Sequence, residues 1–476
     1  MIFSGPEQYR SSGFRPRVIV VGSGPAGVTI ALALGRAGIP VTILEAGSEA
    51  FTESSQAFYR GEVRGDPYFD LDITRLRHFG GSSNHWAGWC RLLDPHDFEP
   101  RAHVPESGWP VGAADLAPWL EEARSILELP PFPPARTFAG DLEQIGFIKS
   151  EPVRFARNFR AQIAASRHVA LVTDAYVPAL HGDGRRVTGL DLWSRGAPAG
   201  RVAAGHVVVA AGGLENARLL LWSNIVSGRG VVPMDAALGR YWMEHPAVQA
   251  GDMVLFGDPP FATDDDGEAF FGPSRAALEA RQILNFHVRL IEDPYPGAKH
   301  LLAQLACVAP GLAEWGARRA GLRLRCAAQL HVGWEQAPDW SNHVALSATG
   351  RDAAGVPRIV LNWRIADSDL HTIRQAMTMT GEAMIRAGAG RVRLAPWLRE
   401  GSLPRTAPLA AHHHMGGTRM GTDPRTSVVD ADCRVHGMEN LFIAGSSVFP
   451  TSGHANPTTT IVLLALRLAD HLVRRP

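Results

Sequence analysis

The chain has 476 residues, with 47 basic and 47 acidic side chains, and 45% of its residues are hydrophobic. This length predicts two or more lobes, and an ordinary apolar content with zero net charge excludes a mainly disordered chain. Balanced charge gives no long-range attraction to nucleic acid, so we expect no nucleic-acid partner. The cysteines form no CxxC pair, which argues against a disulfide framework or a cysteine-based zinc site; they are Cys90, Cys307, Cys326 and Cys433.

The first 17 residues contain no apolar core of signal-peptide length. No uncharged apolar run approaches the ~18 residues that cross a bilayer. We therefore expect a cytoplasmic protein without an intrinsic membrane segment. An exported partner subunit would overturn the expected location.

The first predicted elements form a strand–helix–strand unit. Residues 17–22 contain four consecutive apolar residues, which indicates a strand buried on both faces. A helical stretch follows at 28–38, and a second apolar strand follows at 40–45. The spacing is that of a dinucleotide-binding βαβ unit.

A glycine-rich turn joins the first strand to the helix. Gly22 permits the tight turn, Gly24 lets the backbone approach a pyrophosphate, and Gly27 allows close packing of the helix. The helix N-terminus supplies free N–H groups to the phosphates. Glu45 ends the second strand, where its carboxylate can bind ribose hydroxyls. These features predict a dinucleotide cofactor without separating NAD from FAD.

The later elements alternate in type along the chain. We expect helices at 115–128, with Asp115 as N-cap, and at 215–223, 367–387 and 457–473. We expect strands at 206–212, 283–290, 327–334, 343–346 and 440–445. The pattern between about 239 and 363 favours an antiparallel sheet.

Four sequence blocks carry a resemblance to a known family. They are Gly80-Gly-Ser-Ser-Asn-His-Trp-Ala-Gly88, Ala210-Ala-Gly-Gly-Leu-Glu-Asn-Ala-Arg218, His414-Met-Gly-Gly-Thr-Arg-Met-Gly421 and Pro450-Thr-Ser-Gly-His-Ala-Asn-Pro-Thr458. The chain resembles the glucose–methanol–choline (GMC) family of FAD-dependent oxidoreductases over essentially its whole length. Bacterial members that oxidise sugars and polyols, such as pyranose oxidases and fructose or gluconate dehydrogenase large subunits, are the most similar.

The resemblance implies an α/β fold with two lobes. A Rossmann-like FAD-binding lobe would be assembled from the discontinuous segments 1–115, 151–238 and 405–476. An α+β substrate lobe with an antiparallel sheet would come from 116–150 and 239–404.

The resemblance also places a set of residues at the FAD. They are Gly22, Gly24, Gly27, Glu45, Gly81, Ser82, Asn84, His85, Val177, Ala211, Gly212, Gly445, Ser446, Asn456, Pro457 and Thr458. Pro457 would begin a helix whose N-terminus faces the pyrimidine end of the flavin and stabilises negative charge there. In some relatives the histidine at the position of His85 is bonded covalently to FAD, and in others FAD is held noncovalently. The sequence leaves both readings open.

Catalysis is expected at the C-terminal blocks. The family motif His-x-x-Gly-Thr assigns the role of general base to His414, and the position before the last helix assigns its partner to Asn456. His454 is a candidate for contact with substrate. His412 and His413 are expected to be structural, and no metal is expected, because neighbouring residues of an extended chain point to opposite faces and no partnering Cys or Asp cluster occurs.

The predicted function is FAD-dependent oxidation of the CH–OH group of a sugar, glycoside or polyol, with hydride transfer to flavin N5. A dehydrogenase is favoured over an oxidase, while the electron acceptor (oxygen, quinone, dye or protein) stays open. Two alternatives remain. One is a flavoprotein subunit of a larger electron-transfer complex, and the other is a flavin-dependent lyase or a protein that uses FAD structurally.

Overall fold

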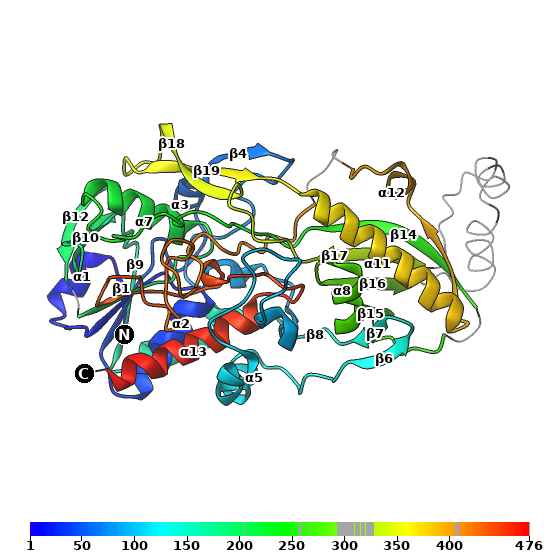
Figure 1. Cartoon of the computed structure of the whole chain (residues 1–476). Coiled ribbons are helices and arrows are strands. Elements are labelled where there is room, and N and C mark those ends of the chain that lie inside the picture. The colour runs from blue at the N-terminus through cyan, green and yellow to red at the C-terminus, as the bar shows by residue number, and fades with distance from the viewer. Residues whose placement is uncertain are drawn as a thin grey trace.

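The computed structural model describes residues 1–203, 205–256, 259–264, 266–292, 328–404 and 409–475, together with 309, 315 and 319. The chain folds into two lobes that lie side by side, and both termini lie in the first lobe (Figure 1). A parallel sheet forms the centre of the first lobe, and an antiparallel sheet forms the centre of the second.

The first lobe is built on a six-stranded parallel sheet. In spatial order its strands are β1 (Ile2–Ser4), β9 (Val169–Thr173), β3 (Val41–Leu44), β2 (Val18–Val21), β13 (His206–Val209) and β21 (Leu441–Ile443). The strands of the predicted βαβ unit, β2 and β3, are fully buried because helices cover both faces of a parallel sheet. Three distant parts of the sequence therefore meet in one sheet.

Two helices, α2 (Pro25–Arg36) and α13 (Thr458–Arg474), pack against each other beside this sheet (Figure 1). Further helices of this lobe are α1 (Pro6–Ser11), α3 (Glu53–Gln56), α6 (Phe155–Ala165) and α7 (Glu215–Val226). Their apolar residues join the strands in one large core.

The helix predicted at 115–128 is divided into short pieces. The pieces are α4 (Ala113–Leu116), the 3₁₀ turn Ala117–Trp119 and α5 (Leu120–Ile126). Asp115 is the third residue of α4 rather than its N-cap, and its carboxylate accepts from the Gly112 N–H at 2.7 Å. Because α5 packs against α13 in the core of the first lobe, the start of the segment 116–150 lies with the cofactor lobe.

The second lobe is built on a seven-stranded antiparallel sheet. Its strands in spatial order are β20 (Gly390–Leu394), β14 (Ala247–Leu255), β17 (Ala328–Trp334), β16 (Phe286–Glu292), β15 (Glu268–Pro273), β7 (Leu142–Ile145) and β6 (Arg136–Ala139). The long helix α11 (Asp367–Arg386) packs on the sheet and shares a second apolar core with it. The helices α8 (Arg275–Arg281) and α12 (Pro396–Glu400) also belong to this lobe.

Smaller sheets flank the two main ones. One contains β18 (His343–Arg351), β19 (Pro357–Trp363) and β4 (Glu62–Gly65). The others contain β10 (Leu180–Gly182), β11 (Val187–Ser194) and β12 (Ala197–Val202), and the pair β5 (Trp89–Cys90) and β8 (Ile148–Lys149). The predicted strand at 343–346 therefore belongs to a separate sheet and not to the seven-stranded one.

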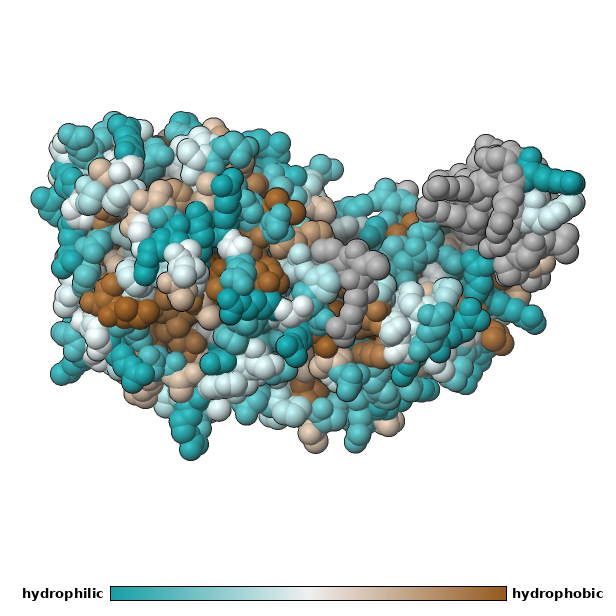
Figure 2. Space-filling model, turned by 90° about the horizontal axis from the view of Figure 1, so that it is seen from above, coloured by the Kyte–Doolittle hydropathy of each residue, from teal (hydrophilic) through white to brown (hydrophobic). Residues whose placement is uncertain are grey.

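The surface seen from above is elongated, and hydrophilic residues cover most of it (Figure 2). Within the described ranges, no helix combines the length and the apolar character needed to span a membrane. Cys90 and Cys433 are buried free thiols, and Cys307 and Cys326 lie outside the described residues.

Candidate active site

A cavity of about 610 Å³ opens where β2, β3 and β13 of the parallel sheet end. Its wall includes the turn after β2, the end of β3, the segment after β13, and residues just before α13. Ligands of open α/β sheets bind at the carboxyl ends of the strands, so this is the expected position of a cofactor. Residues 411–414 form another part of the wall.

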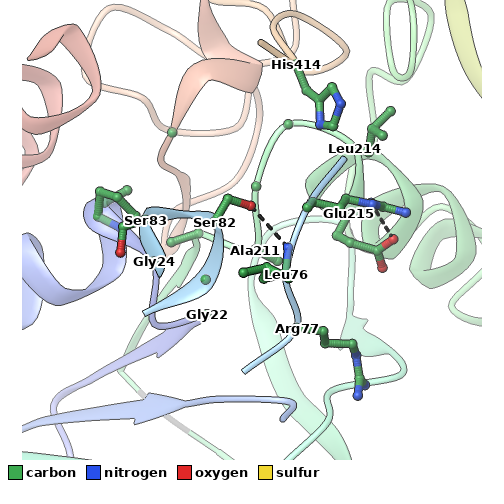
Figure 3. Close-up of a pocket in the computed structure, with 18 of the residues that line it drawn as sticks. Gly22, Gly24, Leu76, Arg77, Ser82, Ser83, Ala211, Leu214, Glu215 and His414 are labelled. Atoms are coloured by element: carbon green, nitrogen blue, oxygen red, sulfur yellow. Dashed lines mark hydrogen bonds and ion pairs between the residues drawn. The ribbon is translucent and has the colours of Figure 1, made fainter. Parts of the chain in front are cut away.

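Glycines keep part of this wall open. A Cβ atom added to Gly24, Gly212 or Gly445 would meet nothing within 4 Å, although all three residues line the cavity. In Figure 3, Gly22, Gly24 and Ser82 lie on one side of the cavity and His414 lies at its upper end. The missing side chains therefore leave room for a ligand against the backbone.

Gly27 has a different task from the glycines of the wall. It does not line the cavity, and a Cβ there would lie 2.0 Å from the carbonyl oxygen of Gly22. Gly22 adopts a φ of +105°, and its own Cβ would lie 2.4 Å from the carbonyl oxygen of Ala210. These two glycines allow the close packing of turn, helix and neighbouring strand that the sequence predicts.

Glu45 follows β3 and lines the cavity at the predicted place. Its Oε2 accepts from the Ser23 hydroxyl at 2.5 Å, and its Oε1 accepts from the Gly47 N–H at 2.8 Å. These bonds fix the buried carboxylate while leaving it acceptor capacity, because an ionised carboxylate has about four acceptor sites.

The end of the chain brings a second helix N-terminus to the cavity. Asn456, Pro457 and Thr458 line the wall, and α13 begins at Thr458. The first N–H groups of a helix have no partner within it and carry a positive partial charge. The wall thus presents the N-termini of α2 and α13 to whatever occupies the cavity.

His414 lies in the cavity wall, and its buried Nε2 has no hydrogen-bond partner. Its backbone carbonyl accepts from the Ser446 hydroxyl at 2.6 Å, which fixes the chain here. Burial, followed by the nearby positive charge of Arg75, holds the pKa of His414 well below its usual range. The imidazole is therefore neutral at pH 7.

His413 also lies in the cavity wall, and it contacts Asn456, the residue that the sequence analysis paired with His414 in catalysis. Its Nε2 is 3.3 Å from the amide nitrogen of Asn456, and its Nδ1 is 2.9 Å from Nδ1 of His245. Burial holds the pKa of His413 well below its usual range. His413, for which only a structural role was expected, thus lies beside Asn456 in the cavity wall.

Besides Gly27, two predicted residues lie away from the cavity wall. The Asn84 amide donates to the Phe79 carbonyl oxygen at 2.8 Å, so it stabilises its own turn. His454 is buried, and its Nε2 lies 3.1 Å from a carboxylate oxygen of Asp94. The remaining predicted residues line the cavity: Gly81, Ser82, His85, Val177, Ala211 and Ser446.

The sequence analysis missed a buried charged network at the cavity. Arg75 donates to Glu215 at 2.9 Å, and Arg218 donates to the other oxygen of Glu215 at 3.2 Å. Burial alone would raise the pKa of Glu215, but the charges of Arg218 and Arg75 lower it overall. The spacing of Glu215 and Arg218, three residues apart on α7, is the only local signal of this network.

A metal site is not among the features of the wall. Within the described ranges, no group of three or more His, Cys, Asp or Glu side chains is arranged to hold a metal ion. Arg77 instead adds a buried guanidinium whose Nη2 has no partner. The open glycine wall, the free Arg77 and His414 nitrogens and the two helix N-termini fit a large anionic dinucleotide.

The fold and this wall define a dinucleotide-binding flavoprotein. A family model described as FAD dependent oxidoreductase matches residues 17–356, and one described as GMC oxidoreductase matches residues 338–465. The chain belongs to the FAD-dependent oxidoreductases and carries the C-terminal domain of the GMC oxidoreductases. FAD is the cofactor of these proteins, so the prediction of FAD rather than NAD is confirmed, as is the predicted family.

Known relatives match most of the chain. The fructose dehydrogenase large subunit of Gluconobacter japonicus is 25% identical and is matched over 84% of this chain and 80% of its own. The 2-methyl-1,2-propanediol dehydrogenase of Mycolicibacterium austroafricanum is 25% identical over 96% of this chain and 95% of its own. A C-glycoside 3-oxidase of Microbacterium trichothecenolyticum is 32% identical, over 57% of this chain and 47% of its own.

A solved structure shows the same fold. Pyridoxine 4-oxidase from Mesorbium loti superposes with a TM-score of 0.61 and 19% identity, covering 97% of this chain and 100% of that one. The predicted fold class, a Rossmann-like lobe with a separate antiparallel-sheet lobe, is confirmed.

Proposed function

We propose that this enzyme oxidises the CH–OH group of a sugar, glycoside or polyol to a carbonyl group. The observation that carries the proposal is that one cavity has both a glycine wall suited to FAD and the neutral imidazoles of His413 and His414. Relatives named for fructose, for a propanediol and for a C-glycoside support the substrate class. The division into a cofactor lobe and a substrate lobe belongs to this proposal, with the start of the segment 116–150 assigned to the cofactor lobe.

FAD, when bound, supplies the acceptor for the hydride that leaves the alcohol carbon. The chain must bind the alcohol, orient its C–H bond and take the hydroxyl proton. A neutral imidazole accepts a proton, and both His413 and His414 have a pKa held below the usual range. The family motif assigns this role to His414, with Asn456 as a hydrogen-bond donor to the alcohol oxygen.

His85 lies in the cavity wall with its side chain exposed, which supports its place beside the cofactor. A covalent bond between His85 and FAD is tested by precipitating the holoprotein with acid. The bond is established if the yellow colour stays in the pellet of the wild type and is released into the supernatant by His85→Ala. Colour released into the supernatant assigns His85 to packing against the cofactor.

The proposed reaction is tested by mixing the purified yellow protein anaerobically with a panel of sugars, glycosides and polyols. We expect loss of the visible flavin absorption with at least one member, together with one equivalent of carbonyl product. A spectrum that stays unchanged with every member would sink the proposal. A simple aliphatic alcohol serves as the control for substrate class.

The electron acceptor is the second part of the proposal. We favour a quinone, dye or protein over oxygen, and the name of the fructose dehydrogenase large subunit supports a flavoprotein subunit of a larger complex. Oxidases occur among the relatives as well. The substrate-bleached enzyme is therefore mixed separately with air-saturated buffer and with a quinone. If the colour returns faster with oxygen than with the quinone, and one equivalent of peroxide is formed, the enzyme is an oxidase and not a dehydrogenase.

A further inference from the structure

A line of hydrogen bonds runs from the cavity into the protein behind His413. Asn456 contacts His413, His413 contacts His245, and Nε2 of His245 lies 3.3 Å from the backbone carbonyl oxygen of Ser452. His245 is buried, and it lies just before β14, far from His413 in the sequence. None of the motifs in the sequence points to His245.

The backbone carbonyl of Ser452, at the inner end of this line, determines which ring nitrogens carry hydrogen. A carbonyl oxygen only accepts, so Nε2 of His245 must carry the hydrogen that it donates to Ser452. Burial lowers the pKa of His245 to about 4, so the ring is neutral at pH 7 and its Nδ1 is bare. The two Nδ1 atoms can share only one hydrogen, and it must therefore belong to His413.

The same reasoning fixes the nitrogen that faces the cavity. A neutral His413 with hydrogen on Nδ1 has a bare Nε2, and the Asn456 amide N–H is oriented to donate to that lone pair. A bare lone pair is what a base needs to accept the proton of an alcohol. The other tautomer would present an N–H group and could not accept one.

The buried carboxyl group of Glu244 fixes the backbone at both histidines. Oε1 of Glu244 accepts the backbone N–H of His245 at 2.9 Å and that of His413 at 2.6 Å, and Oε2 accepts from the Tyr68 hydroxyl. The other titratable groups around His413 are its chain neighbours His412 and His414. Among the described residues, His413 has a defined partner on each ring nitrogen, whereas the buried Nε2 of His414 has none.

We infer that His245 is a positioning residue that fixes the neutral tautomer of His413, so that Nε2 of His413 accepts the substrate proton. This inference rests on the proposed alcohol oxidation and deepens it. A group that orients a catalytic imidazole through its second nitrogen acts without touching substrate. Loss of such a partner typically costs ~10- to 100-fold in activity.

The variant that tests this is His245→Leu, which removes the acceptor for the His413 Nδ1–H. We expect FAD content to be unchanged and the rate of anaerobic flavin bleaching to fall ~10- to 100-fold. His245→Gln offers an amide oxygen to His413 and an amide N–H to Ser452, so it should recover the rate to within a few-fold. The matched control is His206→Leu, because His206 is a half-buried histidine at the end of β13 opposite to the cavity.

A second measurement needs neither substrate nor turnover. In holoprotein labelled with ¹⁵N-histidine, NMR reports which ring nitrogens carry hydrogen, and the His413 signals are identified by their loss in His413→Asn. We expect hydrogen on Nδ1 and none on Nε2 at pH 7, and a mixture of tautomers in His245→Leu. Hydrogen on Nε2 of wild-type His413, a His245→Leu rate within a few-fold of wild type, or failure of His245→Gln to recover it would overturn the inference.

The proposed reaction and the proposed role of His245 are contradicted by different results. If no alcohol bleaches the flavin while NMR finds the expected tautomer and its loss in His245→Leu, then the proposed reaction is wrong and the tautomer assignment holds. If alcohols bleach the flavin but the tautomer is the opposite one, the reaction holds and the role of His245 is wrong.

Discussion

The two sides of the cavity are built in different ways. The cofactor side uses backbone: the turn at 22–27, the segment at 210–213 and the start of α13, where absent side chains and free N–H groups make the surface. The proton side uses side chains from distant parts of the chain, namely His245, His413 and Asn456. Backbone surfaces follow from local motifs, whereas the side-chain line exists only once the fold has formed.

This difference has a consequence for substitution. On the cofactor side a single added side chain fills space that the ligand needs. On the proton side each side chain is hydrogen-bonded to the next, so a substitution at one position also changes the orientation or tautomer of its neighbour. The predictions below probe each side, from the largest expected effect to the smallest.

Gly24→Leu should abolish FAD binding and leave the fold intact. The Cβ of the new side chain meets no atom within 4 Å, so the side chain extends from the backbone into the expected place of the pyrophosphate. Visible absorbance reports the bound FAD, and circular dichroism reports the fold. Gly112→Leu is the control, because Gly112 also precedes a helix with negative φ but lies away from the cavity. A Gly24→Leu protein that stays yellow would contradict the assignment of this wall.

His413→Ala should retain FAD and slow flavin bleaching by ~100- to 10,000-fold, the usual contribution of a general base. His414→Ala should have the smaller effect, because only His413 bonds Asn456. Anaerobic stopped-flow absorbance with saturating substrate measures both rates. The opposite order would return the role of base to His414, as the family motif predicts.

Glu244→Gln should change how the free energy of unfolding depends on pH. Burial raises the pKa of Glu244 to about 7 from 4.5, so the folded protein keeps a proton that the unfolded chain releases. This carboxyl therefore makes stability fall as pH rises from about 4.5 to about 7, by about 3 kcal/mol. The variant should be more stable than wild type at pH 8 and equal to it at pH 4.

Denaturant titrations at the two pH values measure this effect. The exposed Glu7→Gln on α1 serves as the control and should follow the wild type at both. An identical pH dependence for Glu244→Gln and wild type would mean that the pKa of Glu244 is the same in the folded and unfolded states.

Asn456→Asp should shift the pH–rate profile of flavin bleaching along the pH axis and should change the maximal rate less. A carboxylate 3.3 Å from Nε2 of His413 favours the imidazolium and raises the pKa of His413. Since the protonated ring cannot accept a proton, the acid limb of the pH–rate profile should move to higher pH. Asn456→Ala should lower the rate by about 10-fold without this movement. If the acid limb of the profile does not move in Asn456→Asp, His413 is not the group that accepts the substrate proton.

The sequence predicted the cofactor side because its signals are local. The glycines at 22–27 lie within six residues and are flanked by the two strands, so their spacing alone indicates the turn. The last helix was predicted to within one residue at each end, because its apolar face repeats with the helical period. Asn84 shows the limit of such predictions. The block at 80–88 can be recognised from the sequence, but the direction in which the Asn84 side chain points cannot.

The proton side could not be predicted to the same extent. Three consecutive histidines carry no signal of which ring faces the cavity, because that depends on the backbone turn and on neighbours such as His245. The link between Glu215 and Arg75 joins α7 to a loop 140 residues away, so only its local part with Arg218 was visible. Contacts of this kind are set by tertiary packing rather than by spacing.

The central claim is that one cavity transfers a hydride from an alcohol carbon while a nearby imidazole takes the proton. The most direct test compares anaerobic flavin bleaching by a reactive sugar or polyol with bleaching by the same compound carrying deuterium on the reacting carbon. We expect slower bleaching with the deuterated compound in the wild type, at a pH where the imidazole is neutral. The same comparison is made in His413→Ala, in which the chemical step is slow enough to limit the rate. Equal rates for the two compounds in both proteins would contradict hydride transfer from this carbon.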